Sequence, residues 1–87
     1  MVSENVIVIN PEGLHMRPAG ELAKFAKAHP DNKIIVCYGG RSVNASSLMQ
    51  VMMAGINCGA EVTLEVEGKD EKSVLDALVA KFQNGFA

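Results

Sequence analysis

The stretch EVTLEVEG, residues 61–68, decides the fold class. Val62, Leu64 and Val66 are apolar, and the residues between and beside them are glutamates and a threonine. Strict alternation of this kind predicts a strand that buries one face and leaves the other in water. The stretch therefore predicts a sheet that is covered on one side only.

Three further segments are predicted to be strands because they are short, rich in β-branched residues and bounded by turn residues. They are VIVIN (6–10), KIIVCY (33–38) and RSVN (41–44). The pair Gly39-Gly40 separates the last two and predicts a tight hairpin with positive φ angles at the turn.

Three helices are predicted to form the covering layer. The first spans 17–28, where Pro18 fits the first turn and Pro30 ends the helix. The second spans 46–55, and the third is capped by Asp70 and ends at Gly85. The resulting order, βαββαβα, predicts an α+β open-faced sandwich with a four-stranded antiparallel sheet and three helices on one face. We expect residues 1–87 to form a single domain.

Composition and charge exclude several classes of protein. Hydrophobic residues make up 48% of the 87 residues and charged residues 21%, which is typical of a folded domain. The net charge of -2 argues against a general nucleic-acid or anionic-membrane binder. The apolar runs are too short to insert in a membrane, and the N-terminus lacks the features of a signal peptide. We therefore expect a cytoplasmic protein.

The two cysteines and two histidines do not form a metal-ligand pattern. Cys37 and Cys58 lack CxxC spacing, and we expect both to be buried or half-buried thiols, although the sequence leaves a disulfide between them open. His15 and His29 are expected at opposite ends of the first helix, which argues against a shared metal site. His29 is interpreted as a structural residue at the end of that helix.

His15 is the strongest candidate for chemistry. In NPEGLHMRPAGEL (10–22) it lies at or beside the start of a helix, where amides without an internal acceptor and the positive end of the dipole bind anions. The same potential favours a neutral, nucleophilic ring, and Arg17 adds a planar cation suited to phosphate oxygens. The alternative, from these residues alone, is an ordinary histidine N-cap beside a surface arginine.

The predicted middle helix is apolar around almost its whole circumference. A helix on a one-sided sheet can bury only part of that surface, so some of four side chains should be exposed: Leu48, Met49, Met52 and Met53. They are either flexible core-filling residues or, as we favour for the group, a partner-binding surface.

Two motifs, GLHMRPA (13–19) and SSLMQVMMAGINCGAEVTLEVEGKDE (46–71), resemble those of the HPr family, the histidine phosphocarriers of the bacterial phosphoenolpyruvate:sugar phosphotransferase system. The resemblance implies that Nδ1 of His15 accepts a phosphoryl group from phosphorylated enzyme I and passes it to enzyme IIA for sugar uptake. Arg17 would neutralise phosphate charge, and the Met16 and Arg17 amides would hold its oxygens. Such a protein is a monomeric carrier without turnover of its own, and it needs no cofactor or metal.

The resemblance also implies a partner surface and a regulatory site. The surface would comprise the His15 loop and the first helix together with Leu48, Met49 and Met52. Phosphorylation by an HPr kinase/phosphorylase would fall on Ser47, less favourably on Ser46. It would weaken transfer from enzyme I and promote binding to a catabolite-control transcription factor.

Departures from the family pattern leave alternatives open. Met16 replaces a common alanine, and Ser46 replaces a frequent lysine, which bears on recognition by the kinase. Ser47 could instead be a plain helix cap. The main alternative function is an HPr-like regulatory binding module in carbon-catabolite or nitrogen signalling. The presence of His15 argues against the corepressor type, in which that histidine is typically replaced.

Overall fold

The computed structural model describes residues 1–86 and confirms the predicted order of elements. The strands and helices, in chain order, are β1 (Val2–Ile7), α1 (Met16–Lys27), β2 (Asn32–Tyr38), β3 (Arg41–Asn44), α2 (Leu48–Met53), β4 (Glu61–Gly68) and α3 (Glu71–Gln83).

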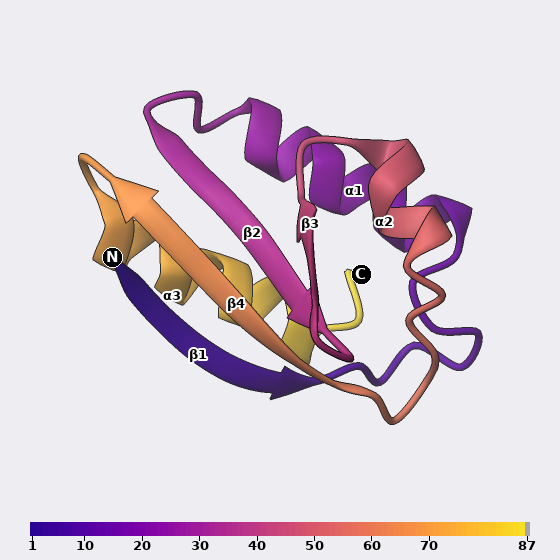
Figure 1. Ribbon diagram of the computed structural model, residues 1–87. Helices are drawn as coiled ribbons and strands as arrows, with labels where there is room; N and C mark the ends of the chain where they lie inside the picture. Colours follow the sequence, from indigo (N-terminus) through magenta and orange to yellow (C-terminus); the bar gives the residue numbers. More distant parts are fainter. Residues whose placement is uncertain (87) are drawn as a thin grey trace.

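The sheet has the strand order β1-β4-β2-β3, and every neighbouring pair is antiparallel. The predicted α+β open-faced sandwich is therefore confirmed. Figure 1 shows the sheet in front, α1 and α3 behind it, and α2 beside α1. Because β4 lies between β1 and β2, the strand with the clearest alternation is an interior strand, paired on both sides.

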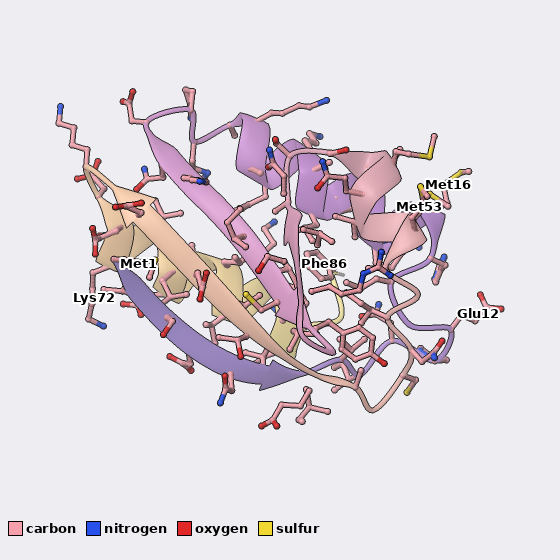
Figure 2. All side chains as sticks on the ribbon, in the orientation of Figure 1. Met1, Glu12, Met16, Met53, Lys72 and Phe86 are labelled. Carbon is pink, nitrogen blue, oxygen red and sulfur yellow. The ribbon has the colours of Figure 1, made fainter. Side chains whose placement is uncertain are left out.

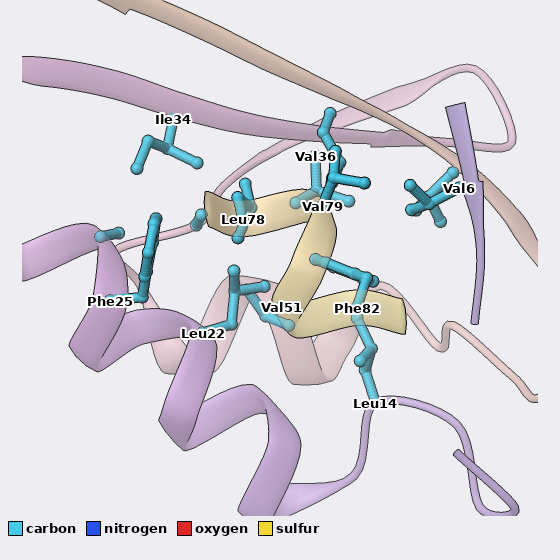
Figure 3. Close-up of a cluster of buried hydrophobic side chains, with 14 of the residues drawn as sticks. Val6, Leu14, Leu22, Phe25, Ile34, Val36, Val51, Leu78, Val79 and Phe82 are labelled. Atoms are coloured by element: carbon cyan, nitrogen blue, oxygen red, sulfur yellow. The ribbon is translucent and has the colours of Figure 1, made fainter. Parts of the chain in front are cut away.

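The alternation along β4 has the predicted effect on burial. Val62, Leu64 and Val66 are at most 1% exposed, while the residues between them are partly accessible on the open face. Their side chains meet those of the helices in one apolar core, which also takes in Leu14 from the loop before α1 (Figure 3). Burial at the centre of the sheet thus extends to the loop that carries His15.

The first strand differs from the predicted range 6–10. It runs from Val2 to Ile7, and beyond it the Val8 backbone bonds to residues 59 and 60 in the loop before β4. Ile9 is exposed. The apolar run VIVI (6–9) is therefore split: residues 6 and 7 end the strand, and residues 8 and 9 belong to the connection. The strand begins before the run, at polar residues, because an edge strand needs only one buried face.

The turn prediction at Gly39-Gly40 is confirmed, and Asp70 stands at the predicted N-cap position of α3 without capping it through its side chain. Gly39 and Gly40 have φ angles of 58° and 80° at the hairpin, as the sequence predicts. Asp70 precedes α3 but its side chain makes no capping hydrogen bond. Instead, Glu71 accepts a hydrogen bond from the Gly68 amide and pairs with the Met1 amino group at 2.9 Å. The hydrogen bond of that pair raises the pKa of the amino group and lowers the pKa of the Glu71 carboxyl.

Both cysteines are free thiols, so the disulfide left open by the sequence is not formed. Cys37 is half-buried, as expected. The prediction for Cys58 is wrong: it is exposed in the connection between α2 and β4, which packs against its neighbours through its backbone. Within residues 1–86, no helix is long and apolar enough to cross a membrane, and no group of three potential metal-binding side chains occurs.

Candidate functional site

His15 is the N-cap residue of α1, with an extended backbone (φ −76°, ψ −171°) and a side chain 41% exposed. Its ring makes no capping hydrogen bond, and its carbonyl accepts from the Ala19 amide at 2.9 Å. Pro18 has no amide hydrogen. The amides that a helix start leaves without an internal acceptor are therefore those of Met16 and Arg17, next to an accessible imidazole.

The loop before His15 is anchored on both sides. The Leu14 amide donates to the Ile56 carbonyl at 3.0 Å, and the Asn10 side-chain amide donates to the Gly85 carbonyl at 2.7 Å. Between them, Gly13 has a φ of +71° and lies directly against residues 56 and 57. The position of His15 is thus set by two segments that are distant in sequence.

Glu12 is a charged neighbour of His15 that the motif analysis did not single out. Its Oε2 lies 3.9 Å from His15 Nε2. Figure 2 shows Glu12 projecting from the side of the molecule where the α1 start and α2 lie. An acid three residues before a histidine, with a glycine turn between them, is the sequence signal that could have indicated this contact.

The two serines before α2 make different contacts. Ser47 is the N-cap residue, and its Oγ accepts from the Gln50 amide at 3.3 Å. The Ser46 hydroxyl instead donates to the Asn44 side-chain oxygen at 2.8 Å. The Gln50 side chain accepts from the Asn44 amide at 2.9 Å, which links the α2 start to the end of β3.

An apolar patch covers α2 and the start of α1. Its members, all exposed, are Met16, Leu48, Met49, Met52 and Met53. The two most exposed side chains of the patch are Met53 at 72% and Met49 at 67%, whereas Val51 from the same helix is fully buried. Met16 and Met53 project from the same side of the molecule (Figure 2), and α1 packs against α2. The expectation that part of this helix is exposed is confirmed.

His29 is separated from this site by the length of α1. Its Nδ1 lies 2.9 Å from the Phe25 carbonyl, and its ring packs on the Phe25 ring with centroids 4.4 Å apart. The carbonyl and the aromatic ring both belong to the same helix. These contacts account for His29 as a structural residue.

Comparisons with known proteins identify a family for the chain. Residues 2–84 match the family model PTS-HPr, described as the PTS HPr component phosphorylation site. The chain belongs to the HPr family. Members of this family are phosphocarriers of the phosphotransferase system. Phosphocarrier protein HPr of Treponema pallidum is 42% identical over 86 residues, covering 99% of this chain and 97% of the relative.

Solved HPr structures share the fold. The crystal structure of HPr from Thermoanaerobacter tengcongensis superimposes with a TM-score of 0.93 at 34% identity, covering 99% of this chain and 96% of that one. Crh of Bacillus subtilis, described as a catabolite repression protein and a swapped dimer, gives 0.76 at 33% identity, covering 100% and 99%. Both sequence motifs lie inside the matched region.

Proposed function

We propose that this chain carries a phosphoryl group on His15 between enzyme I and enzyme IIA proteins of a sugar phosphotransferase system. The single observation that carries the proposal is the accessible, uncapped imidazole of His15 at the start of α1, beside two amides without helical acceptors. The family relationship supports partners that belong to the phosphotransferase system.

The proposed chemistry uses the His15 ring, the two amides at the start of α1 and the exposed Arg17 side chain. The Nδ1 lone pair attacks phosphorus as the bond from phosphorus to the donor nitrogen of enzyme I breaks. The Met16 and Arg17 amides and the Arg17 guanidinium then hold the phosphoryl oxygens, whose charge they oppose. Return of the bonding electrons to Nδ1 releases the group to enzyme IIA. Positioning and electrostatics account for the whole contribution of the chain.

The apolar patch is proposed to dock both partners. Exposed methionines adapt to different surfaces because the unbranched side chain has several accessible rotamers. The patch adjoins the α1 start, so a protein seated on it would cover His15 and exclude water during transfer. Met16, the departure beside His15, adds apolar surface to the patch and is expected to modulate partner choice.

A relay experiment tests this function. Wild-type protein given labelled phosphoenolpyruvate and enzyme I should gain an acid-labile phosphate and lose it when enzyme IIA is added. Arg17→Ala should slow uptake about 10- to 100-fold, the effect expected for one charge-assisted contact. Lys69 is an exposed positive charge just after β4, at the end of that strand far from the His15 loop. The Lys69→Ala variant should therefore accept the phosphoryl group at the wild-type rate. Failure to load the wild type from several enzymes I would contradict the proposal.

Ser47 is proposed as the site of regulatory phosphorylation. A phosphate there would add about two negative charges beside the apolar patch and hinder the docking of enzyme I. With ATP and an HPr kinase, wild type and Ser46→Ala should gain an acid-stable phosphate, and Ser47→Ala should gain none. Undiminished labelling of Ser47→Ala would show that this assignment is wrong.

Regulatory binding is the second candidate function, and full-length similarity to Crh favours it. In that case the chain would bind a transcription factor when Ser47 is phosphorylated, with little transfer to enzyme IIA. The relay separates the two candidates, because a purely regulatory module would fail its second step.

A further inference from the structure

We propose that Glu12 is a positioning residue for His15: the negative charge of its carboxylate favours the proton on Nε2 and so leaves the lone pair on Nδ1. The inference deepens the proposed function and rests on it for the identity of the phosphoryl donor. It goes beyond the motif, because Glu12 lies outside GLHMRPA (13–19).

The Glu12 carboxylate faces one particular nitrogen of the His15 ring. Glu12 Oε2 approaches Nε2 of the ring at 3.9 Å. At this distance, which is too long for a direct hydrogen bond, the ionised carboxylate acts through its negative charge and favours the tautomer with its N–H on the nitrogen that it faces. Both side chains are exposed, which puts the expected effect in the range of a surface ion pair.

The backbone keeps Glu12 and His15 in this relation. Residues 10 and 13 close a turn through the Gly13 amide and the Asn10 carbonyl at 2.9 Å, and Leu14 is bonded to Ile56 and buried. The contact therefore requires ordering only the two side chains, because the loop that joins them is already fixed.

His29 provides the opposite case within the same chain. Its Nδ1 faces the Phe25 carbonyl at 2.9 Å, and a carbonyl only accepts hydrogen bonds. The neutral His29 ring is therefore expected to carry its proton on Nδ1. The two histidines should adopt opposite tautomers, each set by the group that it faces.

The tautomer decides which nitrogen reacts and how the charge changes. When Nδ1 forms the bond to phosphorus, the donor's nitrogen–phosphorus bond breaks, Nε2 keeps its proton and the ring gains a positive charge. The Glu12 carboxylate opposes that charge from the Nε2 edge. When the group leaves, the electron pair returns to Nδ1 and a neutral ring is restored, so no proton needs to move in either step.

The first test uses unphosphorylated protein, so its outcome does not depend on the proposed function. Nitrogen-15 NMR of the imidazole rings, above the titration range of histidine, should show His15 protonated mainly on Nε2 and His29 on Nδ1. In Glu12→Ala the Nδ1–H population of His15 should rise at least twofold, with His29 unchanged. Glu67→Ala, which removes an equal charge at the far end of β4, should leave both rings unchanged.

The second test measures phosphoryl uptake from phosphorylated enzyme I. Glu12→Ala should lower kcat about two- to fivefold with KM unchanged, as expected for loss of an exposed charge pair. His15 tautomer populations identical in Glu12→Ala and Glu67→Ala would overturn the inference, as would a change in KM alone. If the tautomer shifts but no enzyme I loads the wild type, the proposed function fails while the role of Glu12 in setting the tautomer stands.

Discussion

A His15→Ala variant is expected to accept no phosphoryl group from phosphorylated enzyme I. The substitution removes the only imidazole at the α1 start and leaves neighbouring groups that can bind phosphate oxygens but cannot form a covalent intermediate. Incubation with labelled phosphoenolpyruvate and enzyme I should therefore leave the variant without acid-labile label.

The control for this experiment is His29→Ala, which removes the other imidazole of residues 1–86. The His29 ring contacts Phe25 of α1, far from the His15 site, so this variant should still be labelled. Circular dichroism should show both variants folded, since the His15 side chain is exposed and makes no capping bond. Wild-type labelling of a folded His15→Ala variant would contradict the role of His15.

A Gly13→Ala variant is expected to lose about 2–5 kcal/mol of the free energy of unfolding, from left-handed backbone strain and overpacking together. Gly13 has a φ of +71°, and a Cβ there would overlap the Ile56 carbonyl and lie 2.7 Å from the Asn57 Cα. Both obstacles are backbone atoms, which cannot move aside as a side chain can. Urea unfolding followed by circular dichroism measures the change.

Gly20→Ala is the matched control, because it adds the same methyl group within α1. A Cβ at Gly20 meets nothing within 4 Å, and alanine favours a helix interior over glycine by about 0.5–1 kcal/mol. This variant should be as stable as the wild type or slightly more stable. A Gly13→Ala variant that unfolds at the same urea concentration as Gly20→Ala would refute the account of the His15 loop.

The order of elements could be predicted from sequence because each element has a local cause. The alternation around Leu64 places β4, the spacing of small apolar residues places α1, and the Gly39-Gly40 pair places the hairpin. The core of the sheet follows from these patterns. The bounds of α1 and α2 differ from the predicted ones by one or two residues at each end, which local preference alone does not fix.

The first strand and two smaller features could not be predicted, because tertiary contacts decide them. Valine is a residue type that strands favour, but the backbone of Val8 forms hydrogen bonds with the loop before β4 and not with a strand. Aspartate is a common N-cap residue, and Asp70 stands at that position, but it is the Glu71 side chain that accepts a hydrogen bond from the Gly68 amide. Cys58 has an apolar side chain, but its loop packs through backbone atoms and leaves the thiol exposed.

The candidate site was only partly predictable. Placement of His15 at a helix start follows from Pro18 and the apolar spacing after it. The anchoring of Leu14 to Ile56, across more than forty residues, depends on the folded chain. The Glu12 contact needs the turn at Gly13, which the sequence indicates, and the orientation of the His15 ring, which is known only from the folded chain.

The most direct test of the central claim is to locate the phosphate on the wild-type protein. Nitrogen-15 and phosphorus-31 NMR, after reaction with phosphoenolpyruvate and enzyme I, should show one phosphoryl group per chain, bonded to Nδ1 of His15. A phosphate on Nε2, on His29 or on no histidine at all would contradict the account.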